Sequence, residues 1–361
     1  MILNVNIQLN NTDQIKFHAL TDTFNSNFRA ASLWQKYLEN CPDLADPDMV
    51  SKLCKECRLN DREAICRIVA AAFDLDEFGA DRSFYKTYIE KAIKKMDPNR
   101  YIKNPYYQNI HFPNVTSGAW ELKTETYPPF RLFTSDDLFV CDGYTEIPQI
   151  GFFDVPFSFP AVLENGNEWM TLSPVDLDTS DEAIRAAHGN VVTFGLGLGY
   201  YAYRVSEKKE VQSVTVVEKS PDVIKLFQTY LLPQFSNQSK IHIVKADAFE
   251  YAKQQLSEKH FDIAFVDTWR DASDGLDMYI RMKCLERYSP NTVFYYWIEE
   301  FLLSGLRHMI WDSIQIYKNA PELRAIKSDI ISVHEITSFD EIYHMLSKKE
   351  LRRTAALIRK T

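Results

Sequence analysis

Between residues 176 and 300, short apolar runs alternate with segments of helical periodicity. The apolar runs are NVVTF, SVTVVE, KIHIVKA, FDIAFVD and NTVFYYW, and apolar residues recur every three or four positions in the segments between them. Strands that are apolar on both faces and separated by helices are typical of a parallel sheet that helices cover on both sides. The pattern therefore predicts an α/β fold with a Rossmann-like, mostly parallel sheet over residues 176–361.

The first half of the chain follows two other patterns. Residues 1–97 show mostly the three- and four-residue spacing of amphipathic helices, and we expect a helical N-terminal unit there. Residues 98–175 contain short aromatic and β-branched runs between turn residues, which predict a small β-rich unit. A chain of 361 residues is long enough for such a division into several units.

The first predicted strand of the sheet leads into a glycine-rich loop, TFGLGLGYYAY, at residues 193–203. Gly195, Gly197 and Gly199 stand at every second position, although the whole chain has only 11 glycines. A glycine loop between a strand and a helix lets backbone N–H groups face an anionic or polar ligand. Ligands of parallel sheets bind beyond the carboxyl ends of the strands, so the residues that follow each strand are the candidate site.

Carboxylates follow the next three predicted strands, at Glu218, at Asp247 beside Ala248, and at Asp267. Glu218 lies about 20 residues beyond the loop, where a carboxylate accepts hydrogen bonds from ribose hydroxyls in nucleotide-binding sheets. Each signal has an ordinary structural alternative, because Asp247 could cap a helix and Asp267 could cap a turn. Together they predict an adenosine-type ligand.

These residues are compatible with two kinds of ligand. The frame Gly197-x-Gly199-x-x-Ala202 with Glu218 fits a dinucleotide fingerprint and would make the chain a nicotinamide-dependent oxidoreductase. That interpretation gives no role to Gly195, Asp247 or Asp267.

The other interpretation uses all of these residues. The segments VVTFGLGLG, VVEKSPDVI, ADAFEY and FDIAFVDTW resemble the class I S-adenosylmethionine-dependent methyltransferases, and within them the spermidine-synthase-like branch. The resemblance spans about residues 175–300. It implies S-adenosyl-L-methionine as cofactor, bound by the loop of Gly195, Gly197 and Gly199, with Glu218 on the ribose and Asp247 and Ala248 at the adenine.

In the same resemblance, Asp267 occupies the position that faces the reacting sulfonium, and we expect it to be the catalytic residue. Two features differ from the family. Thr193 stands where many methyltransferases have an acid, and the loop DTWRDASDG lacks the proline that follows the fourth strand in aminopropyltransferases. Trp269, in that loop, is expected to shape the pocket, to stack against a cationic substrate, or simply to pack in the core.

The leading hypothesis is a methyltransferase acting on an unidentified small molecule. An aminopropyltransferase-like enzyme that uses decarboxylated S-adenosylmethionine is the first alternative. A protein that binds a nucleoside without catalysis, or that serves as a scaffold, is the second.

Charge and composition limit the partners. The formal net charge of −9 disfavours nucleic acid and favours a neutral or cationic substrate. No apolar run has the length of a membrane span, and the N-terminus lacks a secretory pattern, so a cytoplasmic protein is expected. Cys54 and Cys57 form half of a zinc pattern without a second pair, so no metal site is predicted. The sequence is also compatible with a homo-oligomer.

Overall fold

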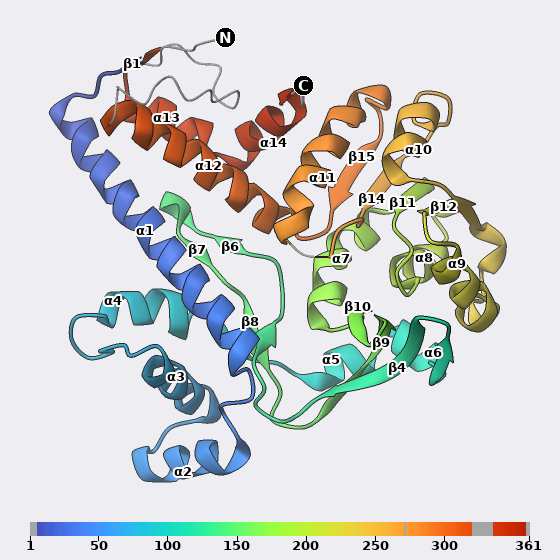
Figure 1. The fold of residues 1–361 in the computed structure, drawn as a ribbon, viewed down its shortest axis with the longest axis horizontal. Helices are drawn as coiled ribbons and strands as arrows, with labels where there is room; N and C mark the ends of the chain where they lie inside the picture. The colour runs from blue at the N-terminus through green and yellow to red at the C-terminus, as the bar shows by residue number, and fades with distance from the viewer. Residues whose placement is uncertain (1–5, 271, 320–334, 359–361) are drawn as a thin grey trace.

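A five-stranded parallel sheet forms the centre of the C-terminal half of the computed structural model, which describes residues 6–270, 272–319 and 335–358 (Figure 1). Its strands lie in the order β13-β12-β11-β14-β15, and all neighbours are parallel. They are β11 (Gly189–Phe194), β12 (Val211–Glu218), β13 (Ile241–Lys245), β14 (Ile263–Val266) and β15 (Val293–Tyr296). Each strand matches one of the five predicted runs to within two residues at either end, which confirms the parallel sheet and the α/β class.

The direction in which strands are added reverses beside β11. From β11 the chain adds β12 and β13 on one side and then β14 and β15 on the other. In parallel sheets the loops leave a crevice at such a reversal, beyond the carboxyl ends of the strands. The reversal therefore places the ends of β11 and β14 at the head of the candidate site.

Helices cover both faces of this sheet. Along β14, Ile263 and Phe265 pack into one hydrophobic cluster, whereas Ala264 and Val266 pack into the other. This alternation follows from the two-residue period of a strand. The first face carries α7 (Pro174–Ala186), α8 (Tyr200–Ser206) and α9 (Pro221–Leu226), and the second carries α10 (Ala248–Gln255), α11 (Ala272–Leu285) and α12 (Glu299–Asn319).

The region between residues 98 and 175 begins with two short helices, α5 (Pro98–Ile102) and α6 (Pro105–Asn109). An antiparallel sheet in the order β10-β9-β4-β3 follows, built from β3 (Val115–Ser117), β4 (Trp120–Tyr127), β9 (Phe157–Glu164) and β10 (Asn167–Thr171). Between β4 and β9 lie the short strands β5 (Phe133–Thr134), β6 (Phe139–Val140), β7 (Glu146–Ile147) and β8 (Ile150–Phe152). Side chains of β4 and β9 join the cluster that includes α7 and α8, so this sheet packs directly on the parallel-sheet domain.

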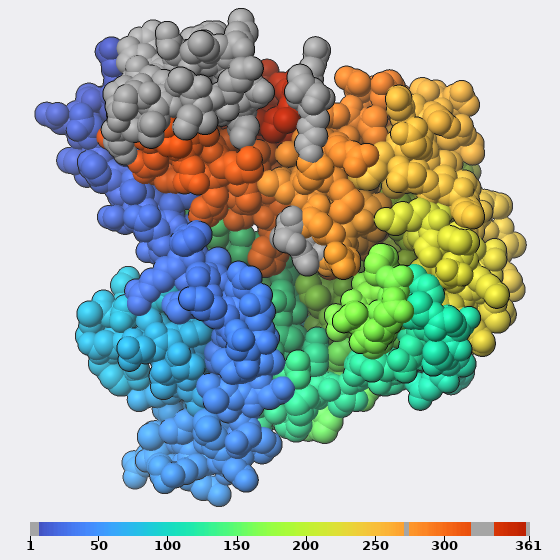
Figure 2. Space-filling view, viewed as in Figure 1, coloured from blue at the N-terminus to red at the C-terminus, as the bar shows by residue number. Residues whose placement is uncertain are grey.

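Residues 11–90 are mostly helical and form the blue part along the left side of Figure 2. The helices are α1 (Asn11–Asn40), α2 (Pro47–Cys57), α3 (Asp61–Ala72) and α4 (Arg82–Tyr85). Side-chain oxygens of Asn10, Asp46 and Asn60 cap the first three of these helices, which fixes where each begins.

The long helix α1 belongs to two hydrophobic clusters. In its first half, Phe24 stacks on Trp311 of α12 with ring centroids 4.8 Å apart. Near its end, the buried Trp34 packs with α3 and donates from Nε1 to the carbonyl of Tyr88 at 3.0 Å. The helical residues are therefore joined to the parallel-sheet domain through one continuous helix.

Two further pairings connect distant parts of the chain. The strand β2 (Ile93–Lys95) pairs with β8, across the predicted boundary at residue 97. The strand β1 (Asn6–Ile7) pairs with β16 (Glu335–Ile336), near α13 (Phe339–Met345) and α14 (Lys348–Leu357). The division at residues 97 and 175 stays a prediction. None of the helices in the described part of the chain combines the length and the apolar character of a membrane span.

Candidate functional site

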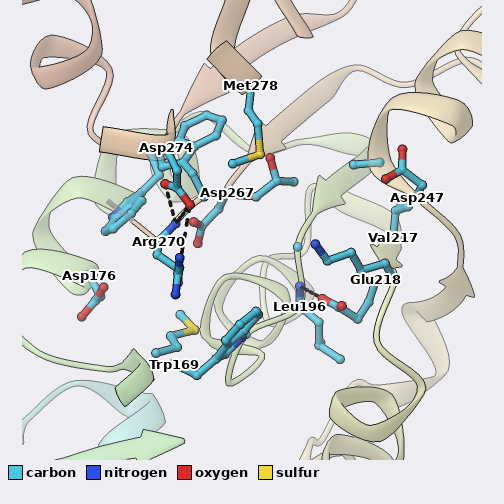
Figure 3. A pocket seen from close by; sticks show the side chains of 18 of the residues that line it. Trp169, Asp176, Leu196, Val217, Glu218, Asp247, Asp267, Arg270, Asp274 and Met278 are labelled. Carbon is cyan, nitrogen blue, oxygen red and sulfur yellow. Dashed lines mark hydrogen bonds and ion pairs between the residues drawn. The ribbon is translucent and has the colours of Figure 1, made fainter. Parts of the chain in front are cut away.

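A cavity of about 560 Å³ opens beyond the carboxyl ends of β11, β12, β13 and β14 (Figure 3). Its size is in the range of sites for small molecules and cofactors. Six of the seven residues singled out in the sequence line it, namely Gly195, Gly197, Glu218, Asp247, Ala248 and Asp267. The fold thus brings together four chain segments that are separated by up to about 70 residues in the sequence.

The glycine loop is approached closely by the protein itself. All three glycines have positive φ values, of 101° at Gly195, 50° at Gly197 and 76° at Gly199. A Cβ on Gly195 would lie 1.9 Å from the backbone oxygen of Asp267, and one on Gly197 would lie 2.0 Å from the sulfur of Met170. The first two glycines therefore let the ends of β11 and β14 and the strand β10 meet around the cavity.

Gly199 is placed differently. It precedes α8 as the N-cap residue, and a Cβ there would lie 2.2 Å from the ring of Phe227. Gly199 is not among the residues that line the cavity. The close approach of the Phe227 ring to Gly199 is a packing contact within the hydrophobic cluster beneath α8.

Glu218 ends β12 and connects it to the glycine loop. Its Oε2 accepts a hydrogen bond from the backbone N–H of Leu196 at 3.2 Å, and its Oε1 accepts one from Ser220 at 2.7 Å. The carboxylate is thereby held at the cavity edge, while each oxygen keeps a second lone pair for a ligand hydroxyl.

Asp247 follows β13 and caps α10. Its Oδ1 accepts hydrogen bonds from the backbone N–H groups of Phe249 at 2.9 Å and Glu250 at 3.1 Å. The capping role considered from the sequence is therefore present. Both bonds end on Oδ1, so Oδ2 is left for a donor in the cavity that Asp247 and Ala248 line.

Asp267 follows β14 and lies near the middle of the cavity in Figure 3. Burial, reinforced by the negative charges of Asp176 and Glu218, raises its pKa to about 8. A carboxyl group with such a pKa can hold or accept a proton near neutrality, which suits a general acid or base.

The structure adds a second buried carboxyl group that the sequence did not single out. Asp176 of α7 lines the same cavity, and burial raises its pKa to about 6. Its Oδ2 accepts from the backbone N–H of Ser173 at 2.8 Å and from the Ser173 hydroxyl at 2.9 Å, in the capping box of α7. The pattern SPVD at residues 173–176 signals that cap, but nothing in it predicts proximity to Asp267.

One wall of the cavity comes from the antiparallel sheet. Glu168, Trp169 and Met170 of β10 line the cavity, and Met170 lies against Gly197 of the glycine loop. Figure 3 draws Trp169 on the side of the cavity opposite Asp267. The Trp169 ring meets Trp120 of β4 edge to face, with centroids 5.5 Å apart. Periodicity predicted this strand, but its position over the loop depends on tertiary packing.

The loop after Asp267 contains two buried polar groups for which the described part of the chain offers no hydrogen-bond partner. Trp269 is 5% exposed, and among the described residues its Nε1 and the Oγ1 of Thr268 are buried with no hydrogen-bond partner. Both residues line the cavity. Trp269 therefore both packs in the core and shapes the cavity wall.

The cavity lining is strongly acidic. Its carboxylates are Glu168, Asp176, Glu218, Asp247, Asp267 and Asp274, and its cations are Lys219 and Arg270. Arg270 is directed to Asp274, with Nε to Oδ2 at 3.8 Å. Such a lining favours a cationic ligand over an anionic one. In the described ranges, no group of three or more His, Cys, Asp or Glu residues could hold a metal ion.

No protein-family model matches this sequence, and no curated protein matches it. Among solved structures, the chain is similar to a spermidine synthase in complex with the transition state analogue AdoDATO, with 13% identity, a TM-score of 0.31, and coverage of 43% of this chain and 58% of that one. It is also similar to spermidine synthase from Thermotoga maritima, with 16% identity, a TM-score of 0.27, and coverage of 35% and 48%. The matched part spans about half the length of these proteins.

Proposed function

We propose that the chain is a transferase with a Rossmann-like domain that binds S-adenosylmethionine or a related sulfonium nucleoside. The observation that carries the proposal is the shared cavity at the strand reversal, where Gly195, Gly197, Glu218, Asp247 and Asp267 surround one space. In sheets of this order, nucleotides bind at that crevice.

The residues present fit such a ligand. The Glu218 carboxylate, held by Leu196 and Ser220, offers acceptor lone pairs to two adjacent ribose hydroxyls. The free Oδ2 of Asp247 offers an acceptor to an adenine amino group, with Ala248 beside it. The acidic lining complements a sulfonium charge and opposes the pyrophosphate of a dinucleotide, which counts against the oxidoreductase interpretation.

Asp267 is placed to handle the proton of the acceptor. The bound sulfonium supplies an electrophilic carbon, and the acceptor's nucleophilic atom forms a bond to that carbon while the carbon–sulfur bond breaks. The proton that leaves the nucleophile passes to Asp267 in its carboxylate form, which the positive charge of the bound sulfonium favours. Because the surroundings raise the pKa of this group, its carboxylate form is a stronger base than an ordinary aspartate. The cavity walls contribute by aligning the two reactants. The acceptor we propose is a small neutral or cationic molecule.

Methyl transfer and aminopropyl transfer differ in the charge of the sulfonium ligand. S-adenosylmethionine carries a carboxylate that needs a cationic or N–H partner, whereas its decarboxylated form does not. Among the described residues that line the cavity, the only cations are Lys219 and Arg270, and Arg270 already faces Asp274. This lining favours the decarboxylated ligand. It is the observation that supports aminopropyl transfer as a second candidate beside methyl transfer.

Isothermal titration with four ligands tests these proposals. S-adenosylmethionine, its decarboxylated form, S-adenosylhomocysteine and NAD are titrated into the full chain in parallel. Tighter binding of S-adenosylmethionine supports methyl transfer, and preference for the decarboxylated form supports aminopropyl transfer. Binding of NAD alone, or of no ligand, contradicts the sulfonium site.

Catalysis is tested separately from binding. With the ligand identified, small amines, alcohols and thiols are screened as acceptors by following release of the nucleoside product. Asp267→Asn should retain ligand binding and lose transfer. A protein that binds the nucleoside but transfers nothing in this screen would instead be a nucleoside-binding or scaffold protein.

A further inference from the structure

The turn between β15 and α12 contains a strained residue. Ile298 has a φ of 46° and is 6% exposed. A side chain branched at Cβ rarely adopts this left-handed conformation, which persists only where the surrounding contacts enforce it. Such strain is concentrated at functional sites, and the residue before Ile298 is Trp297, which lines the cavity.

Trp297 occupies the strand end next to that of Asp267. The strands β14 and β15 are parallel neighbours with Val266 opposite Tyr296, and the backbone N–H of Trp297 donates to the carbonyl of Val266 at 3.0 Å. Trp297 thus follows β15 as Asp267 follows β14. The Trp297 side chain is partly exposed and packs against the hydrophobic clusters on both faces of the sheet. It therefore contributes to the cavity wall on the side of Asp267.

The strand order separates Trp297 from the carboxylates assigned to the nucleoside. Glu218 and Asp247 follow β12 and β13, which lie on one side of β11, whereas Asp267 and Trp297 follow β14 and β15 on the other side. A molecule that binds beside Asp267 would therefore meet Trp297 before it meets Glu218 or Asp247. Trp297 belongs to the part of the cavity where the acceptor of the proposed reaction would lie.

The helix that follows this turn is capped from a distant part of the chain. The carbonyl of Ile298 accepts from the N–H of Leu302 at 3.3 Å, so Ile298 holds the N-cap position, where its aliphatic side chain offers no acceptor. Asp137, in the loop between β5 and β6, supplies the acceptors instead. Its Oδ2 accepts from the backbone N–H of Glu300 at 2.8 Å and its Oδ1 from that of Phe301 at 3.0 Å. These are the two N–H groups that an N-cap side chain normally pairs with.

The first residue of α12 is held from the opposite direction. Glu299 is 8% exposed, and its carboxylate accepts from the hydroxyl of Tyr279 at 2.8 Å and from Nε of Arg352 in α14 at 3.0 Å. These contacts fix the side chain of Glu299, but they supply no acceptor to the backbone N–H groups that follow. The backbone of the first helical turn therefore depends on Asp137.

We propose that Asp137 is a positioning residue for the cavity: by capping α12 from the β-rich region, it maintains the left-handed conformation of Ile298 and so holds Trp297 in the wall beside Asp267. Without this cap, the first turn of α12 can unwind and Ile298 can return to a negative φ, which changes the path of the chain directly after Trp297. The placement of Trp297 does not depend on any ligand. Its use in aligning an acceptor rests on the proposed transferase function.

The placement of Trp297 is tested in the free protein by fluorine-19 NMR of the full chain labelled with 5-fluorotryptophan. The signal that disappears in Trp297→Phe identifies Trp297 among the six tryptophans. Asp137→Ala should shift or broaden this signal and leave that of Trp34, in the helical cluster, unchanged. Asp46→Ala is the matched control, because Asp46 caps α2 by accepting from the N–H of Met49 at 2.8 Å and does not line the cavity.

A folded Asp137→Ala variant with an unchanged Trp297 signal would overturn the proposal. If that variant does not fold, Asp137→Asn takes its place. The amide NH₂ of asparagine cannot accept, so one of the two helix N–H groups still loses its partner. An unchanged Trp297 signal in the asparagine variant would overturn the proposal equally.

The use of the wall is tested with the nucleoside and acceptor that the binding and transfer screens identify. In Asp137→Ala, nucleoside affinity should stay within about twofold of the wild type, whereas kcat/KM for the acceptor should fall by about tenfold or more. An equal loss of nucleoside affinity would indicate general distortion and contradict a positioning role. A wild-type protein that transfers nothing contradicts the proposed function, while the Trp297 signal still tests the role of Asp137.

Discussion

At the scale of single residues, Glu218 has two contacts that connect the glycine loop to the end of β12. Removing the carboxylate should therefore affect both ligand binding and the local backbone. Asp247 combines a cap with a free oxygen in the same way. Each of the two residues can accept its backbone hydrogen bonds and a ligand hydrogen bond at the same time, because a carboxylate has two oxygens with two lone pairs each.

Glu218→Ala should weaken binding of S-adenosylmethionine by more than about tenfold, since loss of a charge-assisted hydrogen bond exceeds 1.4 kcal/mol. It should also lower the free energy of unfolding by about 1–2 kcal/mol, because two backbone N–H groups lose their acceptor. Titration calorimetry and urea unfolding measure the two effects. Glu210→Ala is the control, because Glu210 is exposed and precedes the same strand at its other end. Equal affinities of the Glu218 variant and the wild type would rule out a ribose contact.

Asp267 should make stability depend on pH. Burial raises the pKa of Asp267 to about 8, so the folded protein retains this proton up to that pH, whereas the unfolded chain releases it near the ordinary aspartate pKa of 3.8. Between these values the folded state binds more protons, so this group reduces stability progressively as pH rises through the window. Asp267→Asn should therefore raise the melting temperature, and increasingly so from acidic pH to about pH 8. At the upper end, the gain in the free energy of unfolding should be on the order of 1 kcal/mol or more.

Melting curves at a series of pH values check this prediction. Asp312→Asn is the matched control, because Asp312 is exposed on α12 and should show no such trend. A stabilisation by Asp267→Asn that is constant across the pH range would indicate a packing effect rather than proton linkage.

At the scale of elements, the strand β10 lies over the glycine loop and forms one wall of the cavity. Gly197→Ala should destabilise the protein by about 1–3 kcal/mol from its positive φ alone, and further by the clash with Met170. Met170→Ala should remove the part of the destabilisation that comes from this clash. In Gly195→Ala the clash is with the backbone of Asp267, so no side-chain substitution should relieve it.

A double-mutant cycle of Gly197→Ala and Met170→Ala, measured by chemical unfolding, checks this contact. The interaction energy between the two substitutions should exceed about 0.3–0.5 kcal/mol, the range within which substitutions at independent sites are additive. Additive effects of the two substitutions would mean that β10 does not lie on the loop in solution.

The elements of the parallel sheet were predictable because each strand is a continuous apolar run, a local signal. The glycines and the carboxylates after the strands were predictable because topology fixes which strand ends share an edge. Asp176 and Trp169 were not predictable as members of the site. They reach it through packing between segments far apart in the sequence, and their local patterns indicate only a helix cap and a strand.

At the scale of the whole molecule, a buried ion pair joins the β-rich region to α12. Glu146 accepts hydrogen bonds from Arg307, from Ser304 at 2.7 Å and from His308 at 3.0 Å, and Arg307 is 1% exposed. Burial acts to raise the pKa of Glu146, but the bond to His308 and the Arg307 charge outweigh it and lower the pKa below its usual value. This pair therefore stabilises the protein above the ordinary pKa of glutamate and loses that effect in acid.

Glu146→Ala should lower the free energy of unfolding by about 3–5 kcal/mol, because it leaves the Arg307 guanidinium buried without its main partner. Adding Arg307→Met should recover part of the loss, since the unpaired charge is then removed. Urea unfolding of the two variants measures both steps. A double variant no more stable than Glu146→Ala would assign the loss to the other contacts of Glu146.

The helix α1 has a consequence for how the molecule opens. Its first half packs on α12 and its second half on α3, so neither hydrophobic cluster can separate while the helix stays intact. Its central amide protons should therefore exchange with deuterated solvent only when the entire fold opens, at the slowest rate in the chain. An N-terminal helix of this kind is the last element to become accessible to a protease, not the first.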